Sequence, residues 1–358
     1  MKKILFSFKF TFIDHIKTFI IAIMGGLLFT ILQFPLPFLL GPLTIIVLLR
    51  FLFGISFIWS KHLRDAGLIV IGYILGISFT KQTLLLLIDQ IGFVLFATIM
   101  TILFSLIGAY FIVKRTDISI ESALLGCMPG GLSQMVILAE EYKNANLTSV
   151  TILQVIRVMA VIFLVPFIVS SDSFMPSVPA KTENIHHLYI YQSPWNILLY
   201  GIVIALFLFI ALRFKLATPY LLGPMLAGIL LSVSGFLPPS IPNTILSASQ
   251  LMIGAHLGLM LNPETLKQSK RLTVYATLFG SLLVFFTLFL GKLLTLFSHF
   301  TLATAFLSTA PGGMAEMGIT AIAIGADSAI VAAYQLFRLL FILIVVPPFL
   351  RYIIKKTT

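Results

Sequence analysis

Residues 127–135 read CMPGGLSQM, and residues 309–317 read TAPGGMAEM. Each stretch places Pro-Gly-Gly inside an apolar run in which a helix would otherwise continue. Proline has no backbone N–H to donate and glycine weakens a helix, so we expect one helix to end and another to begin at each Pro-Gly-Gly. The residues of these two predicted breaks are Pro129, Gly130 and Gly131 in the first, and Pro311, Gly312 and Gly313 in the second.

The two breaks belong to an internal duplication. Residues 36–43 (LPFLLGPL) return as 218–225 (TPYLLGPM), and the breaks are separated by the same 182 positions. QVIR at 154–157 returns as QLFR at 335–338 after 181 positions, which a one-residue gap explains. The repeated residues are mostly Gly, Pro, Gln and Arg rather than the Leu and Phe that apolar segments share by chance, so we infer a tandem duplication.

The duplication predicts the division of the chain. Residues 1–170 form the first repeat, the polar stretch 171–192 is a linker, and residues 193–358 form the second repeat.

Composition defines the broad class of the protein. Of the 358 residues, 59% are hydrophobic and 10% charged, with a mean hydropathy of +1.10, which excludes a water-soluble domain of this size. Apolar stretches near the ~20 residues needed to cross a bilayer recur throughout, so we predict an all-α polytopic membrane protein whose environment is the lipid bilayer. The net charge of +11 arises from Lys and Arg at the ends of these stretches, which argues against a nucleic-acid partner. The single Cys127 cannot form an intramolecular disulfide.

The positions of the basic residues indicate a topology. If all twelve apolar segments cross the membrane, seven of the 23 basic residues lie outside. If the Pro-Gly-Gly segment of each repeat enters and leaves on one side, only Lys81, Lys181 and Lys292 lie outside. We therefore predict a cell-membrane protein with cytoplasmic N- and C-termini and two inverted repeats, each with five spanning helices and one re-entrant Pro-Gly-Gly hairpin. A broken spanning helix at each Pro-Gly-Gly is the alternative.

The breaks are the best candidates for a binding site. Irregular backbone survives at membrane depth only where it is buried in protein or lines a wet cavity. Glycine permits close approach to the main chain, and the helix that follows presents free N–H groups and a positive dipole end, so we expect a small-molecule anion. Ser133 and Gln134 follow the first break and could hydrogen-bond the substrate, whereas Glu316 follows the second and could take a cation or a proton.

Arg157 and Arg338 are predicted to lie deep in the last helix of each repeat, where a charge costs several kcal/mol unless it finds a partner. Each arginine follows Gln154 or Gln335 by three residues and hence shares its helix face. Two roles remain open. The guanidiniums bind a substrate carboxylate, or they serve the structure, by capping the C-terminal carbonyls of broken helices or by pairing with Glu140, Glu141 or Glu316. We assign Gln154 and Gln335, with Glu316, to coupling.

Other polar residues could also serve coupling. The hydroxyls of Ser308 and Thr309 could bind a sodium ion, although hydroxyls in membrane helices commonly bond back to their own backbone. His256, where the first repeat has Ile74, could carry a proton or be structural. Zinc-ligand spacing, a nucleophile elbow and a phosphate-binding loop are all missing from the sequence, so we expect neither an enzyme nor a resident cofactor or metal, and only sodium or a proton as coupling ion.

The paired motifs CMPGGLSQM and TAPGGMAEM, followed by QVIR and QLFR, resemble those of the AbrB family of bacterial membrane proteins. Members have been called regulators of gene expression and ammonia monooxygenases, yet this chain has neither a DNA-binding module nor copper ligands. The family looks related to cation:proton antiporters and anion transporters, which implies inverted repeats, a moving core and a scaffold that forms a homodimer. The paired membrane aspartates of many antiporters are missing, which weakens the case for simple sodium:proton exchange.

These observations predict a secondary transporter that moves a small organic anion of the carboxylate type by alternating access, coupled to sodium or protons. The alternative is a non-transporting membrane sensor or regulatory protein that affects gene expression indirectly. A passive channel is a third reading, which uphill transport driven by an ion gradient would exclude.

Overall fold

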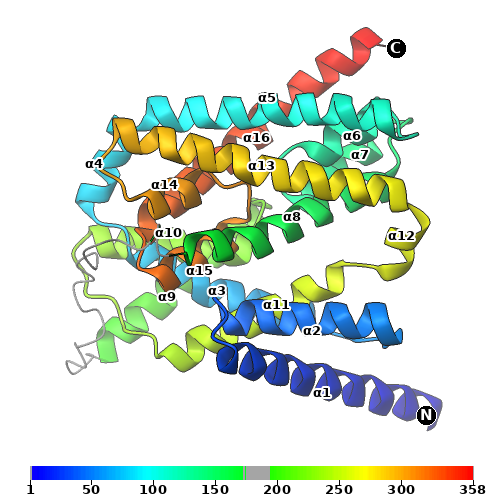
Figure 1. Ribbon diagram of the computed structural model, residues 1–358. Helices are drawn as coiled ribbons and strands as arrows, with labels where there is room; N and C mark the ends of the chain where they lie inside the picture. The colour runs from blue at the N-terminus through cyan, green and yellow to red at the C-terminus, as the bar shows by residue number, and fades with distance from the viewer. Residues whose placement is uncertain (1, 172–173, 175–193, 358) are drawn as a thin grey trace. The chain divides into compact units, whose positions relative to one another are not determined.

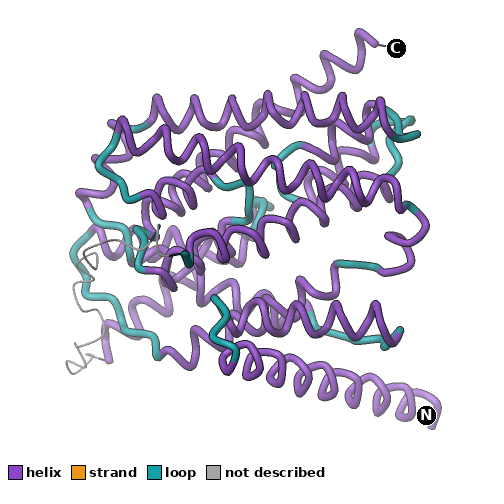
Figure 2. The backbone as a smooth tube through the Cα atoms, viewed as in Figure 1, coloured by secondary structure: helices purple, strands orange, loops and turns teal. Residues whose placement is uncertain are grey.

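The computed structural model describes residues 2–171, 174 and 194–357, and every regular element in this part of the chain is an α-helix (Figures 1 and 2). The predicted linker 171–192 lies outside the described residues, apart from Ser171 and Phe174. The chain divides into two compact units: unit 1 comprises residues 1–80 and 181–263, and unit 2 comprises 81–180 and 264–358. Each unit thus combines a part of both halves of the sequence.

Unit 1 holds the first three helices of each half. Those of the first half are α1 (Lys2–Ile31), α2 (Pro37–Phe53) and α3 (Lys61–Ile77), and those of the second are α9 (Pro194–Arg213), α10 (Pro219–Val233) and α11 (Asn243–Met260). Helix α1 packs on α2 just as α9 packs on α10. Helix α2 also packs on α11, and α10 packs on α3, so the second helix of each half lies against the third helix of the other.

Glycines make this reciprocal packing close. A Cβ atom added to Gly72 of α3 would collide with the backbone oxygen of Leu221 in α10, and one added to Gly254 of α11 would collide with the backbone oxygen of Leu39 in α2. Both the glycines and their partners are 182 positions apart, so the two contacts are copies of each other. Small residues permit such backbone contact between membrane helices, and here they join the two halves of the chain.

Larger side chains at these two glycines should destabilise unit 1. Gly72→Leu or Gly254→Leu forces a side chain against main chain that cannot rotate away, and we expect a loss of about 1 to 3 kcal/mol or more. Thermal unfolding in detergent measures it. Gly201→Leu in α9 is the matched control, because a Cβ atom there meets open space. Equal melting temperatures for all three variants would contradict the assigned packing.

Unit 2 holds the remaining helices of each half. Those of the first half are α4 (Lys81–Asp89), α5 (Ile91–Arg115), α6 (Ile120–Cys127), α7 (Leu132–Glu140) and α8 (Leu147–Val169). Those of the second half are α12 (Pro263–Gln268), α13 (Lys270–Phe297), α14 (Leu302–Thr309), α15 (Met314–Ile324) and α16 (Ser328–Thr357). Helix α12 starts at the boundary with unit 1. The short helix α6 packs on α5 and α8, and the short helix α14 packs on α13 and α16. The two halves therefore repeat their packing here as well.

Six helices of the described residues are long and apolar enough to cross a membrane, or seven if α3 and α4 together form one broken span. They are Asp14–Ile31, Ile91–Arg115, Leu147–Val169, Trp195–Arg213, Lys270–Phe297 and Ser328–Phe349. Of the ten spanning helices predicted from the sequence, the rest are not confirmed. Helices α2 and α10 are apolar but have only 17 and 15 residues, because each starts at a proline and ends near a glycine turn.

Candidate functional site

The two Pro-Gly-Gly stretches are breaks between short helices. Helix α6 ends at Cys127 and α7 begins at Leu132, while α14 ends at Thr309 and α15 begins at Met314. The backbone between them is extended in the same way, with φ −60° and ψ 133° at Met128 and φ −56° and ψ 136° at the corresponding Ala310. The breaks predicted from the sequence are thus confirmed, whereas a re-entrant path through a membrane stays a prediction.

Side chains of α8 hold the first break. The amide Nε2 of Gln154 donates to the backbone oxygens of Leu125, at 2.8 Å, and Met128, at 3.0 Å. The guanidinium of Arg157 donates to the backbone oxygens of Met128 and of Gly130, the latter at 3.3 Å. These carbonyls lie at or beyond the end of α6, where no further turn of helix supplies an N–H donor. Gln154 and Arg157 replace that missing turn.

Side chains of α16 hold the second break in the same manner. Gln335 Nε2 again donates to two backbone oxygens, at 2.8 and 3.0 Å. Arg338 donates to the backbone oxygens of Ala310, at 2.6 Å, and Gly312, at 3.0 Å. The full set of acceptors for this pair is the backbone oxygens of Leu307, Thr309, Ala310 and Gly312. We call each Gln and Arg pair, with the carbonyls that it binds, a clamp.

The clamps show one of the two arginine roles that the sequence leaves open. Arg157 and Arg338 are 3% and 6% exposed, and both give their N–H groups to carbonyls at helix ends. Among the described residues the one ion pair joins Arg64 to Asp65, so neither buried arginine has a carboxylate partner within 4.0 Å. Binding of a substrate by these arginines stays a prediction.

The two clamps differ in how many of their side-chain polar atoms have a hydrogen-bond partner. In the second clamp, Arg338 also donates to the side-chain oxygen Oε1 of Gln335. In the first clamp, Gln154 Oε1 and Arg157 Nε are buried without a hydrogen-bond partner. A buried donor or acceptor without a partner is costly, so the first break retains polar groups that a ligand could satisfy.

The helices that leave the breaks also differ. Gly131 and Gly313 are the N-caps of α7 and α15, and neither provides a side-chain cap. Glu316 is the third residue of α15, and a Cβ atom at Gly313 would collide with its Oε2, so the carboxylate lies over the start of its own helix. The positive end of α15 thus already faces an anion. In α7 the corresponding residue is Gln134, which is neutral, so this position supplies no carboxylate to the positive end of the helix. The side chains of residues 132–134 lie outside the described part of the structure.

At the second break the chain's own carboxylate thus occupies the place expected for an anion, and binding of an anion at either break stays a prediction. Sequence reasoning missed the self-capping of α15, although Glu at the third helical position is its usual signal.

A small polar cavity adjoins the second clamp. Its lining residues come from α5, α14 and α16 and are Val94, Ala97, Thr98, Thr101, Ser308, Thr309, Tyr334 and Arg338. Ser308 donates to the backbone oxygen of Thr304 at 2.7 Å, and Thr309 donates to that of Thr287 at 2.8 Å. The hydroxyl of Tyr334 is buried without a hydrogen-bond partner. Sequence analysis missed Tyr334, which lies four residues before Arg338 on the same helix face.

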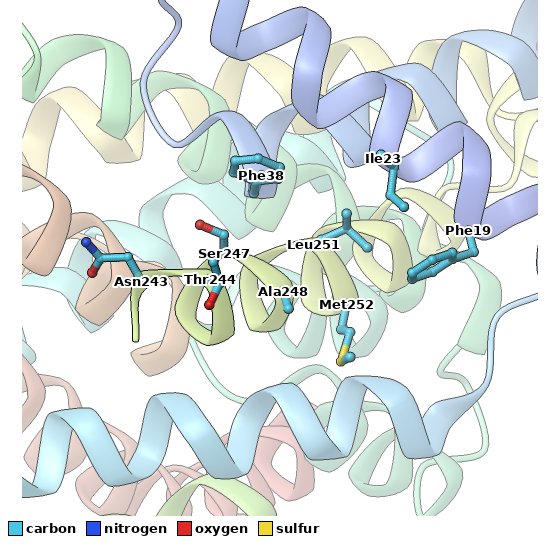
Figure 3. Close-up of a pocket in the computed structure, with 9 residues that line it drawn as sticks. All are labelled: Phe19, Ile23, Phe38, Asn243, Thr244, Ser247, Ala248, Leu251 and Met252. Carbon is cyan, nitrogen blue, oxygen red and sulfur yellow. The ribbon is translucent and has the colours of Figure 1, made fainter. Parts of the chain in front are cut away.

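A separate groove of about 500 Å³ lies in unit 1 (Figure 3). It is lined by Phe19, Ile23, Phe38, Asn243, Thr244, Ser247, Ala248, Leu251 and Met252. Figure 3 shows the polar side chains gathered at the Asn243 end of α11, with Phe38 above them and the other apolar side chains toward Phe19. The groove contains none of the residues predicted to bind substrate.

Two further features of the described residues bear on chemistry. His256 Nε2 lies 3.3 Å from Arg64, which also binds Asp65, so this histidine belongs to a polar cluster of unit 1. No group of three or more His, Cys, Asp or Glu in the described residues could hold a metal ion.

The apolar helices and the clamped breaks define a helical, multi-pass membrane protein. The chain belongs to the AbrB family: the family profile described as "Transition state regulatory protein AbrB" matches residues 38–354. The chain is 26% identical over 338 residues to "Putative regulator AbrB" of Escherichia coli (strain K12), covering 93% of this chain and 94% of that one. It is 27% identical over 301 residues to "Uncharacterized protein YhjN" of Bacillus subtilis (strain 168), covering 80% and 77%. No solved structure matches the chain significantly.

Removal of a clamp donor should destabilise the protein. Gln335→Leu leaves the buried carbonyl of Leu307 without its side-chain donor and that of Ala310 with Arg338 alone, and we expect a loss of about 1 to 3 kcal/mol in thermal unfolding. Arg338→Lys keeps the charge but loses the planar fork, so it should cost nearly as much. Arg213→Lys is the control, because Arg213 is exposed at the end of α9. Unchanged unfolding of Gln335→Leu would contradict the clamp.

Proposed function

We propose that this protein is a secondary transporter that moves a small organic anion of the carboxylate type by alternating access. In this proposal the chain has two inverted repeats, each with five spanning helices and a re-entrant Pro-Gly-Gly hairpin. The observation that carries the proposal is the pair of matching breaks, each held by a buried Gln and Arg. Broken helices with buried polar main chain are typical of transporter binding sites and are costly to a protein that needs only a scaffold.

The proposed anion binds at the first break. There the N-cap of α7 is Gly131, which has no side chain to cap the first N–H groups, and Gly130 and Gly131 allow close approach to the main chain. Ser133 and Gln134 would add hydrogen bonds, and Arg157 would contribute charge and its free Nε. Pro129 completes the proposed site. Arg338 would contribute charge from the second break, whereas Pro311, Gly312 and Gly313, which the sequence also predicts to bind substrate, do not contact the anion in this proposal because Glu316 already lies over Gly313.

Charge in the interior of unit 2 also favours an anion. Two buried arginines, Arg157 and Arg338, exceed the one carboxylate of the breaks, Glu316. Glu316 is half-buried; Glu121, the fully buried carboxylate among the described residues of this unit, lies in the first turn of α6 and accepts from Asn144 at 3.1 Å. A bound carboxylate would therefore balance charge near the breaks, at a place where isolated charges are costly.

The two compact units suggest a division of labour. We assign the moving core to unit 2, which contains both breaks, and the scaffold of a homodimer to unit 1, in which glycine contacts join the two halves. We place both termini in the cytoplasm of a cell-membrane protein, following the distribution of basic residues. The proposal involves no enzymatic step and no nucleic-acid partner.

A membrane sensor or regulatory protein without transport is the second candidate function. The printed names of the family profile and of the Escherichia coli relative favour it, since both describe a regulator. Such a protein would bind its ligand in the same way but would move no ligand across a bilayer. Flux into liposomes separates the two functions.

The first test measures ligand binding as a shift in melting temperature. A panel of carboxylates, amino acids and inorganic anions is added to the purified protein, because a ligand at about 100 times its Kd stabilises the fold by ~2.7 kcal/mol. We expect a carboxylate to shift the wild type, Gly130→Ala to lose that shift, and Gly312→Ala to retain it. Each added Cβ atom meets mainly a flexible methionine side chain, Met135 or Met317, so both variants should fold.

Comparison of Gly130→Ala with Gly312→Ala shows which break binds the carboxylate. Equal loss in both variants, with normal melting of the ligand-free proteins, would contradict binding at the first break. The carboxylate that shifts the wild type is then radiolabelled and offered to proteoliposomes. Uptake above that of protein-free liposomes supports transport, and binding without uptake supports the sensor.

A further inference from the structure

We infer that the coupling ion of this protein is the proton, and that Glu316 carries it. Sodium has no site at the breaks, because the guanidiniums of Arg157 and Arg338 already bind the backbone carbonyls that would coordinate a metal cation. This inference rests on the proposed transport function. It identifies the coupling ion that the sequence leaves open between sodium and the proton.

Helix ends inside a membrane protein attract cations. The last carbonyls of a helix have no intrahelical donor and carry its negative dipole end, and in broken membrane helices such carbonyls coordinate coupling cations. In this chain those carbonyls bind protein side chains instead. Arg157 takes the carbonyls of Met128 and Gly130, and Arg338 takes those of Thr309, Ala310 and Gly312.

A guanidinium differs from a sodium ion in two ways that matter for coupling. It stays protonated at any physiological pH, and it is tethered to its helix, so it can neither leave nor be loaded from solution. Gln154 and Gln335 donate to further carbonyls at the same helix ends. The negative ends of α6 and α14 are thus permanently neutralised, and an ion gradient cannot act there.

The hydroxyls beside the second break do not restore a sodium site. Ser308 donates its proton to a carbonyl in its own helix and Thr309 bonds to carbonyls of its own helix and of α13, so each could offer lone pairs to a cation. Arg338, however, lines the same cavity. A sodium ion there would meet a fixed positive charge at close range in a medium of low dielectric constant, and no carboxylate lines the cavity to offset it.

Among the described residues of the breaks and the clamps, Glu316 is the one carboxylate, and it can gain and lose a proton. It lies at the start of α15, which packs on α8, α14 and α16. Near the clamps, the ionisable groups of those helices are Arg157 on α8 and Tyr334 and Arg338 on α16, and α14 has none. Asp327 precedes α16 and caps its first turn. Neither arginine is within 4.0 Å of the Glu316 carboxylate. Glu316 is therefore not locked in an ion pair and is available for a proton.

Protonation of Glu316 changes the net charge near the two buried arginines and so affects anion binding. When a proton from one aqueous side binds a carboxylate oxygen of Glu316, the two arginines lose the negative charge that partly balances them, and the interior favours an anion more strongly. When the proton leaves to the other side, the carboxylate again competes with the substrate. This sequence predicts co-transport of the anion with a proton in the same direction. No bond other than the O–H bond forms or breaks.

Infrared difference spectroscopy of the protein in liposomes tests the proton site without any substrate. A pH titration should show a protonated carboxyl signal that Glu316→Gln lacks and that Glu140→Gln, changed at the exposed end of α7, retains. The titration should be the same in sodium chloride and in choline chloride. A sodium-dependent shift in the wild type that disappears in Glu316→Gln would overturn the inference, as would a titration that Glu316→Gln leaves unchanged.

Transport in proteoliposomes is the second arm, with the radiolabelled carboxylate identified by the melting-temperature panel as the probe. We expect a pH gradient to drive its uptake without sodium, and Glu316→Gln to lose that dependence while it still binds the probe. Uptake that requires sodium and ignores the pH gradient would overturn the inference and leave the proposed function standing. If Glu316 titrates independently of sodium but no probe is transported, the proton site stands and the proposed function fails.

Discussion

A buried backbone carbonyl that has lost its helical donor must find another, and the rest of unit 2 depends on that constraint. The breaks at Pro129 and Pro311 expose several such carbonyls inside an apolar protein, where water does not satisfy them. Gln and Arg side chains from the last helix of each half supply the donors, and the glutamines do so at the same distances, 2.8 and 3.0 Å, in the two copies. Without these donors, the irregular main chain that makes the breaks useful would be too costly to keep.

The two copies share their helix packing but differ in the polar side chains beside the breaks. Packing is repeated faithfully, from the glycine contacts of unit 1 to the clamps of unit 2. The residues beside the second break are different in kind, since Glu316 replaces Gln134 and Tyr334 replaces Leu153. Duplication thus supplies two equal breaks. In the proposed transporter, these substitutions distinguish an anion site at the first break from a proton site at the second, as a substrate and a coupling ion of opposite charge require.

The two arginines illustrate how structural and functional roles can coincide. A guanidinium that satisfies carbonyls still contributes a full positive charge to its surroundings, and no carboxylate lies within ion-pair distance of either one in the described residues. The clamp therefore does not exclude an electrostatic part in anion binding. It does mean that an arginine substitution disturbs the backbone as well as the charge, which makes Gly130 a cleaner probe of the site than Arg157.

The sequence by itself determined the class of protein, the duplication and the places of the breaks, because apolar content, repeated Gly and Pro, and missing backbone donors act locally along the chain. Only the tertiary structure decided where Arg157 and Arg338 point, since the carbonyls that they bind lie at the breaks, more than 25 residues earlier in the chain, and a sequence does not say which distant groups become neighbours. The same holds for Tyr334, which lines a cavity formed by three helices. The interleaving of the two halves in each compact unit also comes from packing, because Gly72 and Leu221 meet only after the chain has folded.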